Sequence, residues 1–173
     1  MAMQVVNRKG EREDVRFDAI HEKLLKLSKG LNAEWVDPGH VTKLTVEGLY
    51  DGVTTRELDQ LAAETSASLA SHHPDYSRLA ARICVDDLHR STKDNFTDVI
   101  TDLREYIDPE SNKHAPLISA EVYEIIMANA DVLNNHIDYE RDHNYDYFGF
   151  KTLERSYLPV SYTHLRAHET VVH

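Results

Sequence analysis

The side chains best suited to chemistry in this sequence are four basic residues near its start. They are Arg8, Lys9, Arg12 and Arg16. A helix is predicted to begin directly after them, and cations beside its free amides could bind a polyphosphate by replacing its hydration. Four acidic residues lie among the bases and nearly cancel their charge: Glu11, Glu13, Asp14 and Asp18. The local pattern alone therefore leaves a solvated hairpin open as the alternative.

Other chemistry is poorly represented in the sequence. It contains neither a Walker-type lysine loop nor a GxGxxG motif, so a standard phosphate-binding loop is absent. Its 11 histidines show no HExxH motif and no cysteine partner, which argues against a metal site. Cys84 is the single cysteine and lies in a helical apolar stripe. We expect it to be a buried structural thiol and not a nucleophile.

Length and charge limit the class of protein. The chain has 173 residues, enough for one ordinary domain or two small ones, and a net charge of −11. This charge argues against a broad nucleic-acid surface but permits a local basic pocket. No apolar run approaches the roughly 18 residues of a membrane span, and no secretory signal is recognisable. We expect a soluble cytoplasmic protein that binds neither nucleic acid nor membrane.

The elements that would position the basic residues are a hairpin and a set of helices. Val5 and Val6 precede a turn at 7–10, and Val15 and Phe17 alternate with polar residues in a second strand over 11–17. Asp18 is the predicted N-cap of a first helix that Gly30 would end. A second helix is predicted from Pro38, capped by Asp37, up to a break at residues 51–52.

Two further helices complete the first half. Thr54 and Glu57 form a capping-box pattern that begins a helix reaching about residue 72. Pro74 and Asp75 restart the helical pattern, with Leu79 and Leu88 facing inward. Residues 1–94 are therefore predicted to be a short hairpin lying on four helices, and the whole chain is predicted to be mainly helical.

The second half is predicted to be helical but less self-contained. An amphipathic helix over 96–107 ends at Asp108-Pro109, and a loop is predicted over 109–118. Ser119 begins the next helix, and a shorter one is predicted over 132–137. An aromatic cluster then precedes residues 151–158: Tyr145, Tyr147, Phe148 and Phe150. Residues 160–173 resemble one reading frame of a sequencing adapter, and we expect them to be an artefact of the gene model.

Several separated motifs resemble one family. Residues 4–18 (QVVNRKGEREDVRFD) resemble the opening of an ATP-cone. Residues 48–59 (GLYDGVTTRELD) and 147–158 (YFGFKTLERSYL) are similar to the large subunit of class I ribonucleoside-diphosphate reductase, eukaryotic type. Shorter matches at 61–65, 73–76 and 79–83 follow the same order along the chain. The resemblance covers the chain from about Met3 to Leu158.

The resemblance implies an architecture and a reaction. In this family an N-terminal ATP-cone, here 1–94, and a helical region, here 95–159, precede a ten-stranded α/β barrel that is missing from this sequence. The barrel holds the catalytic cysteines, which reduce ribonucleoside diphosphates through a thiyl radical that a small subunit initiates. Cys84 matches none of them, so we expect no catalytic residue and no activity in this chain alone. The family also implies a homo-oligomer of large subunits.

The resemblance also implies an effector site in the cone. Its residues carry over to the following positions: Asn7, Arg8, Glu13, Asp14, Val15, Arg16, Phe17, Asp18, Ala19, Thr55, Asp59 and Arg90. Asn7 stands where a lysine is usual and Arg90 where a lysine closes over phosphates, while Lys9 replaces an acidic residue and could restore the missing charge. Thr55 and Asp59 are spaced i, i+4 and share a helix face.

The expected ligands are ATP as activator and dATP as inhibitor, with Mg²⁺ accompanying the nucleotide. They would compete for one cone, each favouring the subunit assembly that it binds better. Two alternatives stay open. One is a stand-alone ATP-cone regulator, such as a repressor with a zinc ribbon, although the four ligands of a ribbon are lacking here. The other is a helical interaction module with a degenerate, empty cone.

Overall fold

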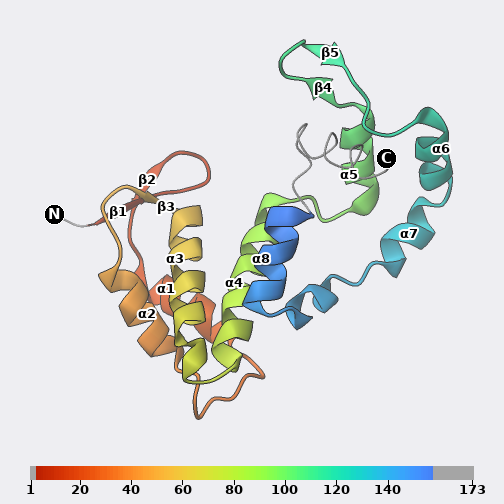
Figure 1. Cartoon of the computed structure of the whole chain (residues 1–173). Coiled ribbons are helices and arrows are strands. Elements are labelled where there is room, and N and C mark those ends of the chain that lie inside the picture. Colours follow the sequence, from red (N-terminus) through yellow and green to blue (C-terminus); the bar gives the residue numbers. More distant parts are fainter. Residues whose placement is uncertain (1–2, 158–173) are drawn as a thin grey trace, which may run out of the picture. The chain divides into compact units, whose positions relative to one another are not determined.

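The computed structural model describes residues 3–157. The adapter-like residues 160–173 lie outside this range. The described chain divides into two compact units, one formed by residues 3–87 together with 142–157 and the other by residues 88–141. Helices dominate both units, which confirms the mainly helical fold (Figure 1). The division into domains 1–94 and 95–159 stays a prediction.

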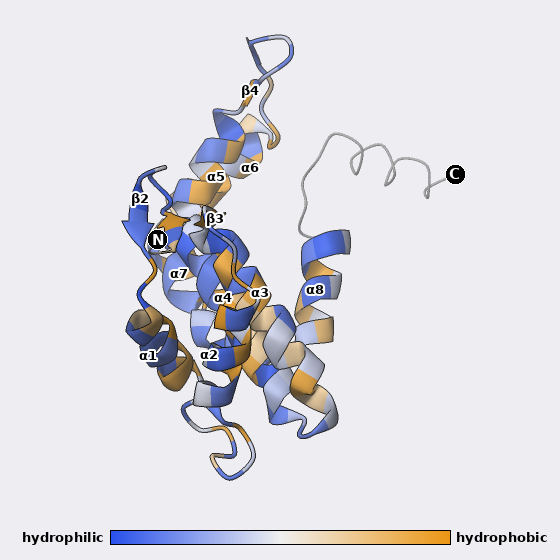
Figure 2. Cartoon of the chain, turned by 90° about the vertical axis from the view of Figure 1, so that its left-hand side faces the viewer, coloured by the Kyte–Doolittle hydropathy of each residue, from blue (hydrophilic) through white to orange (hydrophobic). Residues whose placement is uncertain are grey.

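A three-stranded sheet begins the first unit. Strand β1 (Gln4–Val6) pairs antiparallel with β2 (Arg12–Asp14) and parallel with β3 (Val53–Thr54), in the order β2-β1-β3. This confirms the hairpin and adds a third strand that the sequence reading lacked, since β3 has only two residues. The exposed β2 is hydrophilic throughout (Figure 2). Val5 of β1 is buried, and it pairs with Val53 of β3, which is buried as well.

Helix α1 (Phe17–Leu27) begins earlier than predicted. Its N-cap is Arg16, so the prediction that Asp18 caps the helix is wrong. The amide of Val15 still donates to the carbonyl of Met3, which holds the chain beside β1 until just before the turn into the helix. Asp18 instead lies in the first helical turn, where a carboxylate complements the helix dipole.

The next two helices begin as their capping residues predict. The Asp37 carboxylate accepts a bond from the amide of Gly39 and begins α2 (Pro38–Glu47), which ends before the predicted break at residues 51–52. Thr54 and Glu57 form the predicted reciprocal capping box of α3 (Thr55–Ser68). A short 3-10 segment, η1 (Leu69–Ser71), follows α3.

Helix α4 (Asp75–Ser91) supplies much of the core of the first unit. Leu79 and Ile83 are fully buried, and Leu24 from α1 and Val41 from α2 are buried as well. Each such side chain contributes about 1.5–3 kcal/mol by leaving water. Cys84 is buried in the same helix, as predicted for a structural thiol.

Helix α8 (Tyr147–Ser156) returns to the first unit from far along the sequence. Its N-cap Asp146 accepts a bond from the amide of Gly149, and the amide of Tyr147 donates to the Ser77 hydroxyl of α4. Phe150 is buried. Figure 1 shows α8 running beside α4. Part of the aromatic cluster thus lies in the first turn of a helix that contacts α4 of the first unit.

The second unit contains short elements. They are α5 (Phe96–Arg104), β4 (Ile107–Asp108), β5 (Lys113–His114), α6 (Ala120–Ala128) and α7 (Ala130–His136), and η2 (Tyr139–Asn144) leads back to the first unit. Ser119 caps α6 as predicted. The prediction of a helix up to residue 107 is wrong, because α5 ends at Arg104, and the predicted loop over 109–118 contains the short strand β5. Ile107 pairs with His114, because Asp108 accepts bonds from the amides of Glu110 and Ser111 and closes a hairpin turn.

Between residues 3 and 157, no helix is both long enough and apolar enough to cross a membrane.

Candidate functional site

The turn of the first hairpin is held by the side chain of Asn7. Its Oδ1 accepts bonds from the backbone amides of Lys9 (2.9 Å) and Glu11 (3.0 Å), and its Nδ2 donates to the Glu11 carboxylate (3.0 Å). Gly10 closes the turn with a φ of 83°, a conformation that glycine adopts without strain. Asn7 therefore shapes the turn that carries Arg8.

Arg8 reaches from this turn to helix α4. Its guanidinium Nη2 lies 2.8 Å from Asp87 Oδ1. The Nε of Arg56, in the first turn of α3, lies 3.7 Å from the other oxygen of the same carboxylate. Asp87 thus lies between two guanidinium groups that come from different elements.

A second ionic group includes Asp86, the residue that precedes Asp87 in α4. Lys23, from the middle of α1, places its Nζ 2.6 Å from Asp59 Oδ1 and 2.9 Å from Asp86 Oδ2. The three side chains are largely buried, with exposures of 12% to 24%. Removing one partner of such a group is costly because the remaining charge stays partly desolvated.

These two ionic groups meet at the neighbouring α4 residues Asp86 and Asp87, and together they are called the ionic cluster: Arg8, Lys23, Arg56, Asp59, Asp86 and Asp87. They come from the hairpin turn and from helices α1, α3 and α4. The cluster gathers three cations from three elements of a chain whose net charge is −11, and cationic donors of this kind can bind phosphate oxygens. The carboxylates within the cluster balance these cations.

The predicted residues 13–19, around the start of α1, form a mostly exposed segment that is called the rim below. Glu13 and Asp14 belong to exposed β2, and Phe17 and Ala19 are exposed in the first turns of α1. Val15 follows β2 directly. Arg16 Nη2 donates to Asp18 Oδ2 at 2.9 Å, and this hydrogen bond lowers the pKa of Asp18. The rim residues carry polar and aromatic groups but no dense cationic centre.

The remaining predicted residues lie on two helices. Thr55 and Asp59 are one turn apart on α3, and Asp59 is a member of the ionic cluster. Arg90 lies in the last turn of α4, in the part of that helix that belongs to the second unit. Of the predicted residues, the structure brings Arg8 and Asp59 into the cluster.

A small polar hollow adjoins the cluster within the first unit. It has a volume of about 50 Å³ and is lined by Arg56, Gln60, Cys84, Asp87, Lys151 and Glu154. Burial raises the pKa of the Cys84 thiol to about 11, so the thiol is neutral near pH 7. Burial opposes the charge of Lys151, but its hydrogen bond to Glu154 raises the pKa of Lys151 overall.

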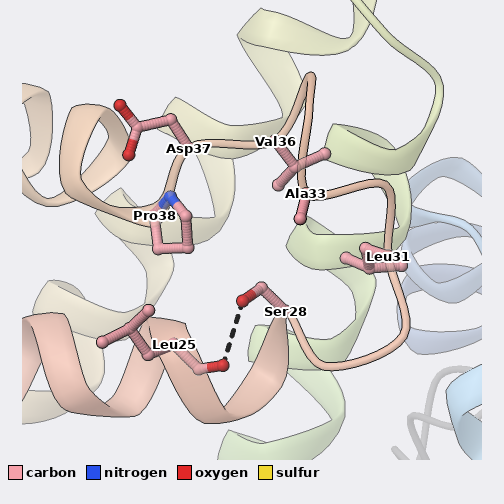
Figure 3. Close-up of a pocket in the computed structure, with 7 residues that line it drawn as sticks. All are labelled: Leu25, Ser28, Leu31, Ala33, Val36, Asp37 and Pro38. Carbon is pink, nitrogen blue, oxygen red and sulfur yellow. Dashed lines mark hydrogen bonds between the residues drawn. The ribbon is translucent and has the colours of Figure 1, made fainter.

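Another cavity, of about 240 Å³, lies where α1 ends and the chain leads into α2. Its walls are mostly apolar, and its carboxylate, Asp37, is engaged as the cap of α2 (Figure 3). Ser28 is likewise engaged, since its hydroxyl donates to the carbonyl of Leu25. No group of three or more metal-ligating side chains is present among residues 3–157.

Sequence reasoning missed four members of the cluster. Lys23 lies four residues after Ala19, and Arg56 lies three residues before Asp59, so both are one helical turn from a predicted position. Asp86 and Asp87 lie one turn before Arg90. Helical spacing from the predicted residues could have found all four. Their pairing with Arg8 and Asp59 required the tertiary structure.

Comparison with known proteins shows the family of this chain. A family model described as the ATP cone domain matches residues 3–91, just over half of the chain. The chain belongs to the ATP-cone family. Every member of the ionic cluster lies within this cone.

Longer relatives extend the similarity beyond the cone. The chain is 52% identical over 156 residues to a ribonucleoside-diphosphate reductase large subunit from Danio rerio, and 55% identical over 154 residues to one from Caenorhabditis elegans. It is 52% identical over 156 residues to the large chain 2 of the Saccharomyces cerevisiae enzyme. These matches cover about 90% of this chain but only about a fifth of each relative.

Proposed function

We propose that the cone binds ATP and dATP at the ionic cluster and so forms the overall-activity site of a ribonucleoside-diphosphate reductase large subunit. The observation that carries the proposal is that Arg8 and Arg56 both contact Asp87, while Lys23 contacts the neighbouring Asp86, all within the matched cone. Mg²⁺ would accompany the nucleotide.

The polyphosphate would lie against the two arginines. Arg8 and Arg56 have side-chain exposures of 37% and 72%, so both can reach a ligand from solvent. A guanidinium presents a planar fork of donors that suits phosphate oxygens. Asn7 supports this role by holding the turn, while Arg90 would close over the phosphates from the end of α4.

The nucleoside would lie between α3 and the rim. Asp59 can accept a hydrogen bond from a ribose hydroxyl, which is the group that differs between ATP and dATP. Thr55 lies one turn away on the same helix and adds a hydroxyl. The rim residues from Glu13 to Ala19 would frame the base.

The rest of the proposal concerns the longer protein. We propose that this chain is the N-terminal part of a large subunit that reduces ribonucleoside diphosphates with a radical-generating small subunit, and that ATP activates while dATP inhibits through different homo-oligomers. The names of the relatives support the enzyme class. The single cysteine of this chain, with its raised pKa, gives no basis for catalysis by the chain itself.

Calorimetric titration of the full chain with ATP and with dATP tests the proposal. We expect saturable binding of both nucleotides and mutual competition. A folded, monodisperse chain that binds neither nucleotide would favour the alternative of a degenerate cone that serves as a helical interaction module.

The Arg8→Ala variant tests the location of the site. Removing one charge-assisted contact should weaken ATP and dATP alike by about 1.5–3 kcal/mol. The same titration measures the effect, and Lys43→Ala, which removes an exposed cation on α2, serves as the control. Equal affinities in the Arg8 variant and the native chain would show that the phosphates bind elsewhere.

A further inference from the structure

Asp87 makes the contacts that a phosphate would make. One oxygen of its carboxylate lies 2.8 Å from the guanidinium of Arg8, and the other lies 3.7 Å from that of Arg56. A phosphate bound to the same two arginines would likewise offer one oxygen to each. The carboxylate therefore occupies the place where the arginines would hold an anionic ligand.

We propose that Asp87 is an internal competing anion, which a nucleotide must displace from Arg8 and Arg56 before its phosphates can bind. Asp87 then determines the affinity of the cone for polyphosphates. The inference rests on the proposed function, because it concerns the same site.

The exchange is physically feasible. A phosphate group carries up to about two negative charges and three acceptor oxygens, so it outcompetes a single carboxylate for two guanidinium groups. The Asp87 side chain is 18% exposed, and both arginines are more exposed than it is. These groups can therefore separate without unpacking the core.

The displaced carboxylate also has a place to go. Asp87 lines the polar hollow of about 50 Å³, which is also lined by Lys151 from α8. Rotation of Asp87 toward this hollow keeps its charge near a cation, which limits the cost of losing Arg8. Asp86 does not share this arrangement, since it contacts Lys23.

Asp87→Asn isolates the competing charge while keeping the size of the side chain. We expect this variant to bind ATP and inorganic tripolyphosphate about fivefold more tightly than the native chain, because the partly exposed ion pair between Arg8 and Asp87 no longer has to be broken. Adenosine, which has no phosphate, should bind with unchanged affinity. Glu47→Gln removes an exposed acid of α2 and controls for net charge. Urea denaturation of each variant verifies folding.

A double-mutant cycle separates competition for Arg8 from simple charge repulsion. If Asp87 competes for Arg8, the gain from Asp87→Asn should shrink in an Arg8→Ala background, whereas long-range repulsion would persist there. Equal gains in both backgrounds would overturn the inference, as would an unchanged affinity of Asp87→Asn.

Failure of the proposed function has a different signature. If the native chain binds no nucleotide but Asp87→Asn does, the competing role of Asp87 is supported and the proposed function of the native chain fails. If neither binds ATP or tripolyphosphate, both proposals fail. If the native chain binds and the variant gains nothing, only the role of Asp87 fails.

Discussion

At the scale of single residues, Asn7 lacks the positive charge of the lysine that is usual at this position in the resembled family, but its side chain fixes the hairpin turn. Its carbonyl oxygen accepts two backbone amides, which is a role that Asn performs well and lysine cannot perform. Arg8, the next residue, then supplies the cation that reaches α4. Asn7 thus holds the turn of the proposed site, and its neighbour Arg8 supplies the positive charge.

Asp59 is expected to distinguish the two nucleotides. Asp59→Asn keeps the size of the side chain but makes it a weaker acceptor for a ribose hydroxyl, so the ratio of the ATP and dATP affinities should change. Calorimetric titration measures both affinities. Asp86→Asn is the matched control, because it removes the other carboxylate that contacts Lys23. An unchanged ratio in Asp59→Asn would remove this residue from the discriminating role.

Cys84 is expected to be inert toward thiol reagents. Burial raises its pKa from 9.0 to about 11, so at pH 8 its thiolate fraction is about 100-fold lower than that of an ordinary cysteine. A colorimetric thiol reagent should therefore label the native chain at least about 100-fold more slowly than the urea-unfolded chain. The assay reports this residue alone, since the chain has one cysteine. Comparable rates in the two states would contradict the buried thiol.

At the scale of elements, α3 connects the sheet to the cluster. Thr54 ends β3 and also caps α3, so the residue that pairs with β1 fixes the start of the helix that carries Arg56 and Asp59. The amide and hydroxyl of Thr54 both donate to the Glu57 carboxylate at 2.8 Å. These bonds lower the pKa of Glu57.

Thr54→Ala should destabilise the chain by about 1 kcal/mol, the usual cost of losing an N-cap. Thr54→Ser keeps the hydroxyl and should retain most of the stability. Because the folded pKa of Glu57 is lowered, its bonded carboxylate stabilises the chain above the ordinary glutamate pKa, and this contribution is lost as the pH falls through the folded pKa. Urea denaturation at neutral and acidic pH measures both effects. Equal stability of the Ala and Ser variants would contradict the capping role.

At the scale of the whole molecule, the chain returns to its first unit after an excursion through the second. Helix α8 packs by its amide bond to Ser77 and by buried Phe150, and it supplies Lys151 and Glu154 to the hollow beside Cys84 and Asp87. Two members of the ionic cluster, Arg56 and Asp87, therefore line the same hollow as residues of α8, a helix that lies beyond the matched cone.

Phe150→Ala should loosen α8 from the cone helices. Truncating a buried phenylalanine costs about 3–5 kcal/mol, and loss of α8 from the hollow should speed the labelling of Cys84. Urea denaturation and the thiol assay measure the two effects. Phe148→Ala lies on the same helix, but its side chain is 79% exposed, so this control should change neither. Unchanged labelling in Phe150→Ala would show that α8 does not cover the thiol.

The sequence by itself determined the elements whose signals are local. Asp37, Thr54 with Glu57 and Ser119 marked the starts of three helices, because a capping side chain bonds to amides within the next few residues. Residues 4–18 indicated an ATP-cone, which the family match over residues 3–91 confirmed. The start of α1 was misplaced, since pairing of residue 15 beside β1 outweighed the capping preference of Asp18.

Only the tertiary structure decided which charges meet. The pairs Arg8 with Asp87 and Lys23 with Asp59 join residues 79 and 36 positions apart. Sequence spacing carries no information about contacts between separate helices, because those depend on how the apolar faces pack. The pairing of the two-residue strand β3 with β1 and the contact of α8 with α4 likewise depend on long-range partners, because no local signal specifies either contact.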